Sequence, residues 1–377
     1  MEQKTQHETD WLVVARDLAA TFAERAAMHD ADDSFVAQNY AALKGRKLFS
    51  AGIPAELGGG GASHATLCQL LRVLAGGCGS TALALAMHTH LIAGTVWRWK
   101  HGDKTAEPLL RRVAAEELIL VSSGGSDWLD GSGTAEKVEG GFKITARKVF
   151  GSGSPGGQLL LTMAVYDDPE AGRTVLHLPI PLAAPGVAIQ DNWRTLGMRG
   201  TGSNDIAINE VFVPDAAIAV RRPAGKWHRF WDVVSPLVWP LVYSVYAGVA
   251  DAARAVALSC AASRREDPFV QALVGEMETE LATADVALAA MIANANEYDY
   301  QPMTERSRRT YMYKTVVARS VLAAVDKAME VAGGASFYRS TGLERLFRDV
   351  QGARFHPFTE KRQYQFSGRI TLGLDGV

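Results

Sequence analysis

The chain has 377 residues, of which 47% are hydrophobic and 21% are charged, and its formal net charge is −2 at pH 7. Such a composition is ordinary for a globular protein with a sizeable core, and it argues against disorder. The near balance of acidic and basic residues excludes an overall electrostatic attraction to nucleic acid or to an anionic membrane surface. We therefore expect neither as a partner.

Two further features of the sequence bear on the compartment. The polar N-terminal stretch MEQKTQHETD lacks the apolar segment of a secretory signal, so a cytoplasmic location is expected. The three cysteines, Cys68, Cys78 and Cys260, have no metal-ligand spacing and stand in apolar helical surroundings. We therefore expect reduced, buried thiols and no metal site.

Helical patterns dominate up to about residue 118. Apolar residues recur at spacings of three and four in Trp11–Ala27 and in Phe35–Leu48, and Ser80–Trp99 is an almost entirely apolar helix. Gly and Pro residues mark the breaks between these segments. The first domain is therefore predicted to be helical and to span residues 1–118.

The apolar helix carries two histidines, His88 and His90. Side chains two residues apart on a helix point to different faces, so these two cannot together hold one metal ion. One of them could belong to the core and the other to a pocket. For each, a hydrogen-bonded structural role and a catalytic role stay open.

Strand patterns begin at about residue 119. Glu136–Val149 reads as a hairpin with Gly140 and Gly141 at its turn. Further strands are predicted at Leu159–Tyr166, Thr174–Pro179 and Asp205–Val213. The Pro and Gly residues between them fit a small β-barrel or sandwich, so a central β domain is predicted over residues 119–226.

Long helical patterns return after the strands. They are predicted at Trp231–Ser263, Phe269–Glu297, Ser307–Ala332 and, as a short helix, Leu343–Val350. Lengths of this kind are typical of a four-helix bundle, which is predicted to span residues 227–377. The whole chain is thus expected to have an α+β fold in which a β domain separates two helical domains.

One segment of the first long helix could also be interpreted as a membrane span. Val233–Ala250 contains no charged residue. Pro236 and Pro240 interrupt it, however, and its helical pattern continues into Asp251 and Arg254. A buried helix of a large helical domain is therefore favoured.

The clearest family signature lies near the C-terminus, in the run GGASFYRSTGLERLFRD from Gly333 to Asp349. Two glycines, an aromatic-rich turn and an E-R-hydrophobic-aromatic-R-D segment resemble the C-terminal signature of the acyl-CoA dehydrogenase superfamily. The resemblance implies a flavoprotein with helical, β and helical-bundle domains, and a homotetramer.

Three stretches of the β region resemble the flavin-contacting segments of that superfamily. The first, LVSSGGSD at residues 120–127, is similar to a shortened T-E-P-G-x-G-S-D loop and implies flavin contacts from Ser122 and Ser126. The second, KVFGSG at residues 148–153, implies that Phe150 lies against the flavin ring and that the Ser152 hydroxyl is near it. The third is LGMRGTGSNDI, whose R-G-T-G-S form is common in the monooxygenase branch.

The same resemblance implies flavin contacts from Arg264, Gly333, Gly334 and Thr359. Arg264 stands in a contracted form of a segment that holds the FAD of a neighbouring subunit. Glu330 replaces a glutamine of that site, and a carboxylate repels a pyrophosphate. The cofactor is expected to be FAD or FMN, and these departures weaken the case for tight FAD binding, so whether the flavin is tightly held stays open.

The catalytic base of the dehydrogenases is missing at both of its usual positions. These enzymes need a carboxylate within reach of the substrate α-proton. Counting from Arg348-Asp349, one position is Pro357, and the other is Val238 or Trp239. A shift of register could bring Glu360 into the role.

These departures resemble the two-component flavin monooxygenases of the same superfamily, among them the dibenzothiophene monooxygenases. Members of that branch take reduced flavin from a partner reductase and form a C4a-hydroperoxide in a dry pocket. The resemblance implies catalytic roles for His356, Ser152 and His88, although a helix-capping role for His356 also stays open. Trp239 and Tyr243 are predicted to line the substrate pocket, with Tyr246 in the bundle core.

The leading hypothesis is therefore a reduced-flavin-dependent monooxygenase that acts on a small organic substrate. One alternative is an FAD-dependent acyl-CoA dehydrogenase. Another is a catalytically silent, flavin-binding member of the superfamily.

Overall fold

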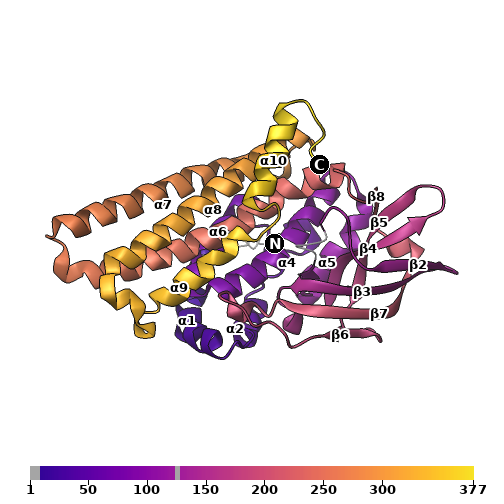
Figure 1. Cartoon of the computed structure of the whole chain (residues 1–377). Coiled ribbons are helices and arrows are strands. Elements are labelled where there is room, and N and C mark those ends of the chain that lie inside the picture. The colour runs from indigo at the N-terminus through magenta and orange to yellow at the C-terminus, as the bar shows by residue number, and fades with distance from the viewer. Residues whose placement is uncertain (1–8, 124–127) are drawn as a thin grey trace, which may run out of the picture.

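The computed structural model describes residues 9–123 and 128–377, so the predicted flavin residue Ser126 lies outside the described residues. Long helices form one side of the molecule, and a β-sheet lies at its other end (Figure 1). The predicted α+β class and the order of helices, strands and helices along the chain are confirmed.

Two of the N-terminal helices, α1 and α3, begin at residues whose side chains cap them. The Asp10 carboxylate accepts hydrogen bonds from the N–H groups of Leu12 and Val13 at 3.0 and 3.1 Å, and the Ser63 hydroxyl accepts one from Thr66 N–H at 3.0 Å. Such side-chain acceptors satisfy N–H groups that have no partner within the helix. The helices are α1 (Trp11–Ala31), α2 (Ala37–Gly45), α3 (His64–Gly77), α4 (Gly79–Lys100) and α5 (Glu107–Glu116).

The described strands form one sheet, and the predicted hairpin is confirmed as β2 paired with β3. One face of the sheet buries an apolar core that includes Phe142, Ile144, Leu160 and Ile206. The alternation of these residues with exposed ones is what places them on one face. The strands are β1 (Leu120–Ser122), β2 (Thr134–Val138), β3 (Gly141–Gly151), β4 (Leu159–Asp168), β5 (Gly172–Pro181), β6 (Val187–Ile189), β7 (Asn204–Pro214) and β8 (Val220–Pro223).

The order of the strands does not confirm the expected barrel. Along the sheet the order is β6-β7-β3-β2-β4-β5-β8, with β1 pairing parallel to β4. Within the described residues, β6 pairs only with β7 and β8 only with β5. The two ends of the sheet are therefore not joined by strand pairing, as closure of a barrel would require.

The C-terminal helices differ from the predicted four-helix bundle. Three are long, with 33, 28 and 29 residues, and the short α9 packs across α6 and α8. A further helix, α10, was not predicted, and it packs on α8. The helices are α6 (Arg229–Ala261), α7 (Pro268–Ala295), α8 (Thr304–Ala332), α9 (Leu343–Val350) and α10 (Glu360–Thr371).

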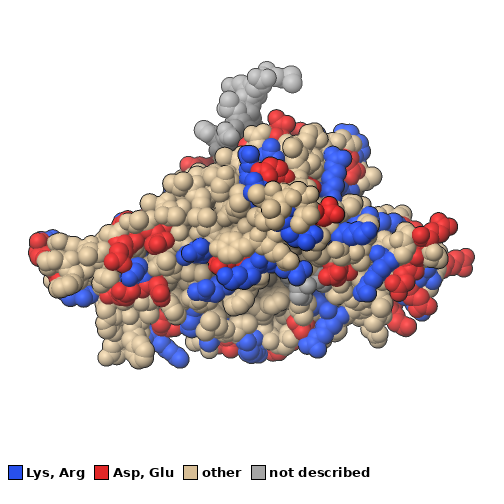
Figure 2. All heavy atoms as spheres, turned by 45° about the horizontal axis from the view of Figure 1, so that its top comes forward, with Lys and Arg blue, Asp and Glu red and all other residues tan. Residues whose placement is uncertain are grey.

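Helix α6 is the central helix of the molecule, because it packs against α3, α4, α7 and α8. It is long and apolar enough to cross a membrane by length and composition, but 94% of its most apolar window is buried inside the protein. This burial agrees with the predicted core helix. On the face shown in Figure 2, acidic and basic side chains are interspersed, as expected from the small net charge.

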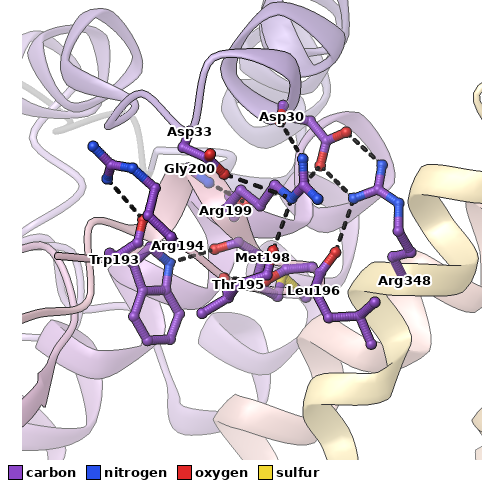
Figure 3. Close-up of polar contacts among 12 residues, drawn as sticks. Asp30, Asp33, Trp193, Arg194, Thr195, Leu196, Met198, Arg199, Gly200 and Arg348 are labelled. Carbon is purple, nitrogen blue, oxygen red and sulfur yellow. Dashed lines mark hydrogen bonds and ion pairs between the residues drawn. The ribbon is translucent and has the colours of Figure 1, made fainter.

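An ion pair joins the first helix, α1, to the short C-terminal helix α9. The Arg348 guanidinium on α9 binds the Asp30 carboxylate at the end of α1 through two contacts of 2.8 and 2.5 Å. It also donates to Glu344 Oε2 at 2.7 Å and to the carbonyl of Leu196 at 2.9 Å. Figure 3 shows Arg348 and Arg199 converging on Asp30. We call the Arg348–Asp30 pair with the loop 193–200 the clasp.

The neighbouring residue Asp349 completes the clasp. Its carboxylate accepts a hydrogen bond of 2.5 Å from Met198 N–H, and its side chain is buried. The loop lies so close to α9 that a Cβ on Gly197 would stand 2.3 Å from the carbonyl oxygen of Arg348. Only glycine fits at that approach. The R-D pair of the family signature therefore fixes the loop that precedes β7.

Replacing Arg348 is expected to destabilise the protein markedly. Side chains of Arg348 and Asp30 retain only 17% and 14% exposure, so Arg348→Met would leave a mostly buried carboxylate with Arg199, 4.0 Å away, as its remaining cation. Breaking such a pair costs about 3 kcal/mol. Urea unfolding monitored by circular dichroism measures the change.

The matched control is Arg194→Met on the same loop. Arg194 pairs with Asp191, but the two side chains are 53% and 88% exposed. Exposed pairs contribute about 1 kcal/mol or less. Equal unfolding midpoints for the two variants would show that the clasp does not stabilise the fold.

Candidate functional site

His356 lies in a loop between α9 and α10, beside an aromatic side of α6. Its Nε2 is 2.7 Å from the hydroxyl of Tyr246. The rings of Trp239 and Tyr243 stand 6.3 and 6.2 Å from the imidazole, centre to centre. The predicted substrate residues Trp239 and Tyr243 are thus brought together with His356, while Tyr246 is both a core residue and a partner of His356.

The surroundings keep this pair neutral. Burial, together with the nearby side chains of Lys314 and His90, lowers the pKa of His356 to about 3. Burial raises the pKa of Tyr246 far above its ordinary value. Near pH 7 the site therefore offers an uncharged imidazole and an uncharged phenol. One hydrogen bond joins the two groups, and each can form another.

The side chains of Tyr243 and Lys314 hold the backbone of the His356 loop through hydrogen bonds. Tyr243 donates its hydroxyl hydrogen to the carbonyl of Ala353 at 2.7 Å. Lys314 of α8 donates to the carbonyls of His356 and Phe358 at 3.1 and 2.5 Å. At Gly352 a Cβ would lie 2.6 Å from the Tyr246 hydroxyl, so the loop approaches α6 as closely as glycine permits.

Lys314 is an unusual side chain for this position, because it is only 2% exposed. No carboxylate stands within ion-pair distance of it among the described residues. Its ammonium instead lies over the rings of Trp239 and Tyr243, at 5.3 and 5.2 Å from their centres. Burial lowers the pKa of Lys314 to about 7.

An aromatic cluster connects this loop with the end of the first strand. The ring of Trp128 is 5.0 Å from that of Phe358 and 6.3 Å from that of Trp239. Ser122, a predicted flavin residue, ends β1 shortly before Trp128. The residues near the start of the β region and the C-terminal loop therefore meet in space, although more than 200 positions separate them.

The predicted residue Ser152 belongs to a chain of hydroxyl groups. Its Oγ lies 2.8 Å from Ser203 Oγ, which lies 2.7 Å from Thr201 Oγ1. Thr201 donates to the carbonyl of Met198 at 2.9 Å. The R-G-T-G-S segment thus supplies two hydroxyls that support Ser152.

Phe150 presents an aromatic ring at the end of β3. Its side chain is 51% exposed, and its backbone has a left-handed φ of 57°. Trp193 packs edge-on against it at 6.0 Å. Trp193 also borders an open hollow of about 370 Å³ whose lining does not include His356. The hollow is lined by Asp33, Phe35, Pro155, Ile189, Gln190, Asp191, Trp193, Arg194, Gly202 and Asn204.

Three other predicted flavin residues gather elsewhere in the chain. Arg264 donates to the carbonyls of Val331 and Ala332 at the end of α8, and its guanidinium is 3.4 Å from where a Cβ on Gly333 would be. Gly334 follows directly. The segment after α8 lies at the end of the long helices far from the sheet (Figure 1). The structure thus separates Arg264, Gly333 and Gly334 from Phe150 and Ser152 within one chain.

The two histidines of α4 have different surroundings. His88 is 1% exposed; its Nδ1 accepts from Leu120 N–H at 2.9 Å and its Nε2 donates to the carbonyl of Phe49 at 2.7 Å. Both ring nitrogens are used, so the catalytic role expected for His88 gives way to the structural alternative. His90 is partly exposed and close enough to His356 to lower its pKa.

A rescue by Glu360 finds no support in the geometry. Glu360 begins α10, its side chain is 43% exposed, and it pairs with Lys361. Pro357 lies in the loop next to His356, and Val238 and Trp239 are buried apolar residues. Thr359 is exposed at the N-cap of α10, where its side chain makes no capping bond. The usual positions of the carboxylate are thus occupied by groups that cannot abstract a proton.

Comparisons with known proteins agree with the geometry. The family model "Acyl-CoA dehydrogenase, N-terminal domain" matches residues 5–117, and "Acyl-CoA dehydrogenase, C-terminal domain" matches residues 243–361. The amino sugar nitrososynthase RubN8 of Streptomyces rubradiris is 32% identical, over 93% of this chain and 86% of its own. The chain belongs to the acyl-CoA dehydrogenase family.

Other members of this family extend the comparison. A dibenzothiophene monooxygenase of Mycolicibacterium goodii is 26% identical over 94% of this chain and 91% of its own. The solved structure of KijD3 with FMN and dTDP-3-amino-2,3,6-trideoxy-4-keto-3-methyl-D-glucose superposes with a TM-score of 0.88. It is 28% identical and covers 99% of this chain and 95% of its own. The resemblance to the monooxygenase branch of the family is thereby confirmed.

Sequence reasoning missed several side chains of the site. Lys314 stands in an apolar helix pattern, which is itself a signal, because a lysine on a buried face needs a partner. Tyr246 was predicted only as bundle core, although it lies seven residues after Trp239, two turns along the same face. Thr201 and Ser203 were visible in the R-G-T-G-S motif without a role.

Replacing Lys314 by methionine is expected to change how stability depends on pH. The pKa of Lys314 is about 7 in the folded protein and rises to its ordinary value on unfolding. Between these values the unfolded chain binds one more proton, so the free energy of unfolding rises with pH by about 1.4 kcal/mol per unit. Below about pH 7 the contribution vanishes.

Chemical denaturation of both proteins from pH 6 to pH 10 measures this difference. The wild-type protein should gain stability relative to Lys314→Met as pH rises above 7. Lys361→Met is the control, because the Lys361 side chain is 87% exposed. Parallel curves for wild type and Lys314→Met would refute the buried, easily deprotonated lysine.

Proposed function

We propose that this protein is a flavin-dependent monooxygenase, which uses reduced flavin to oxygenate a small organic substrate. The observation that carries the proposal is the neutral His356–Tyr246 pair. It lies beside the aromatic side of α6, at the loop where the dehydrogenases of the family hold a carboxylate. A hydrogen-bonding pair without a base suits oxygen transfer and does not suit abstraction of an α-proton.

The residues present fit a flavin. Phe150 offers an exposed aromatic face for a planar ring, and the Ser152 oxygen stands two residues further along the same strand end. Ser122 ends β1 on the side of the aromatic cluster. We propose that these three residues contact the flavin ring, which when bound supplies the activation of molecular oxygen.

Arg264, Gly333 and Gly334 could complete the flavin site only from another copy of the chain, since they lie far from Phe150 and Ser152. We therefore propose a homotetramer in which these residues contact the flavin of a neighbouring subunit. Thr359, exposed at the start of α10, is proposed as a further flavin contact. Glu330 stands where the dehydrogenases of the family have a glutamine that holds FAD. This replacement favours FMN that is exchanged with a separate reductase.

The side chains around His356 have distinct roles in the proposed reaction. His356 and Tyr246 supply hydrogen bonds to the reacting atoms and can move a proton between them. Trp239 and Tyr243 keep water out, which favours oxygen transfer over release of peroxide. Lys314 holds the loop through the carbonyls of His356 and Phe358. His90, with a ring nitrogen free of described partners, is a second proton carrier.

The division into domains at residues 1–118, 119–226 and 227–377 remains our proposal, as does a cytoplasmic location. Two alternatives for function stand beside the monooxygenase. An acyl-CoA dehydrogenase would need a base that the described residues do not supply at Pro357, Val238 or Trp239. A silent flavin-binding member of the family would bind flavin without turnover.

Oxygenation is tested with ¹⁸O₂, FMN, NADH and a separate flavin reductase. Purified protein is incubated with a panel of amino sugars, sulfur heterocycles and aromatic compounds, and the products are analysed by mass spectrometry. Incorporation of one ¹⁸O atom is expected. A parallel incubation with acyl-CoA esters and an electron acceptor, in which any ester is oxidised, would contradict the monooxygenase. Flavin binding without either reaction would favour the silent member.

His356→Ala is expected to uncouple the reaction. Loss of the proton-transferring group should lower product formation by about 100-fold or more, while reduced flavin is still oxidised and hydrogen peroxide is released. The ratio of product to NADH consumed measures this coupling. His101→Ala, at an exposed position at the end of α4, is the control and should leave the ratio unchanged. Unchanged coupling in His356→Ala would remove His356 from the mechanism.

A further inference from the structure

The hydroxyl chain at Ser152 has only one possible direction of hydrogen bonding. Each hydroxyl carries a single hydrogen. Thr201 must give its hydrogen to the carbonyl of Met198, 2.9 Å away, because a carbonyl can only accept. The contact of 2.7 Å between Thr201 and Ser203 therefore needs the hydrogen of Ser203. The contact of 2.8 Å between Ser203 and Ser152 then needs the hydrogen of Ser152.

The oxygen of Ser152 consequently has no hydrogen left to give. Toward any further partner it offers lone pairs, so it can accept a hydrogen bond but cannot donate one. Thr201 and Ser203 are 0% and 4% exposed, so water does not readily compete for their hydrogens. Ser152 itself is 9% exposed, the most of the three hydroxyl residues.

The direction of the chain is set by the clasp. Met198 is held by the hydrogen bond from its N–H to the Asp349 carboxylate, and its carbonyl also accepts from the indole N–H of Trp193 at 3.1 Å. The Met198 carbonyl thus has a fixed position and is the final acceptor of the hydrogen bonds from Ser152 through Ser203 and Thr201. The Thr201 N–H also donates to this carbonyl, at 3.1 Å. A rotation of the Thr201 hydroxyl would break its own bond and leave two oxygens 2.9 Å apart with no hydrogen between them, which costs free energy.

A hydroxyl that only accepts can distinguish the oxidation states of a flavin. Reduction adds hydrogen to ring nitrogens that in the oxidised ring carry only lone pairs. We propose that Thr201 and Ser203 are specificity-determining residues that make Ser152 an acceptor, and that the site thereby selects reduced over oxidised flavin. The inference rests on the proposed function, in which Ser152 contacts the flavin ring.

The selection would serve a protein that receives its flavin from a reductase. Reduced flavin would gain a hydrogen bond to Ser152, whereas oxidised flavin would place lone pairs against lone pairs and leave the hydroxyl unsatisfied. Product flavin would therefore be the weaker ligand and would leave. Ser203 and Thr201 act through Ser152 and do not themselves touch the ring.

Binding of three flavins to the wild-type protein provides the first test. Dissociation constants are measured anaerobically by fluorescence for oxidised FMN, reduced FMN and oxidised 5-deaza-FMN, in which a C–H replaces the ring nitrogen. Reduced FMN is expected to bind about tenfold more tightly than oxidised FMN, the effect of one hydrogen bond made or left unmade. The 5-deaza analogue should bind more tightly than oxidised FMN, because it lacks the opposed lone pair.

Variants of the supporting hydroxyls provide the second test. Ser203→Ala frees the hydrogen of Ser152, so the preference for reduced FMN should fall by about tenfold and the reduction potential of bound FMN should fall by about 30 mV. Thr201→Val should act in the same direction, and Thr201→Ser, which keeps the hydroxyl, should restore the wild-type ratio. Ser154→Ala is the control, since that buried serine donates to the carbonyl of Gly202 outside the chain of hydroxyls.

The outcomes separate this inference from the proposed function. If wild-type protein binds no flavin in either state, the proposed function fails. If it binds flavin but the ratio of dissociation constants is the same in wild type, Ser203→Ala and Thr201→Val, the inference is overturned and the proposed function stands. Oxidised FMN that binds as tightly as its 5-deaza analogue would also overturn it.

Discussion

The contact between the R-D pair of α9 and the loop 193–200 is the constraint on which the rest of the site depends. Arg348 joins α1 to α9 through Asp30, and Asp349 fixes Met198. Segments from the start, the middle and the end of the chain therefore meet at one place. Because the carboxylate of Asp349 is buried, it would be costly to leave without the Met198 N–H, and this bond therefore holds the loop against α9.

Two site features inherit their geometry from this contact. On one side, the Met198 carbonyl starts the hydrogen bonds that reach Ser152 through Thr201 and Ser203. On the other side, α9 leads into the loop of His356, whose backbone is held by Lys314 and Tyr243. A displacement of α9 would thus disturb both the proposed flavin contact and the proposed proton carrier, which are otherwise distant in sequence.

The sequence predicted the local elements better than their assembly. The hairpin of β2 and β3 and the long helices α6 to α8 follow from apolar periodicity and turn glycines. The strand order, the unclosed sheet and helix α10 depend on contacts between distant residues, which periodicity does not encode. The family resemblance pointed to His356, but only the fold showed its partner Tyr246 and the hydrogen bonds that occupy both ring nitrogens of His88.

The electrostatics of the site explain why neutral hydrogen-bonding groups stand where the dehydrogenases have a catalytic carboxylate. A buried base at Pro357 would stand next to Lys314, and the pair would bring charges into an aromatic environment. In the present arrangement the lysine donates hydrogen bonds to two carbonyls, and burial lowers its pKa to about 7. His356 stays uncharged because of the same burial and the same lysine. The loop is therefore built around neutral hydrogen-bonding groups, and a dry, uncharged pocket is the environment in which oxygen transfer can proceed without loss to water.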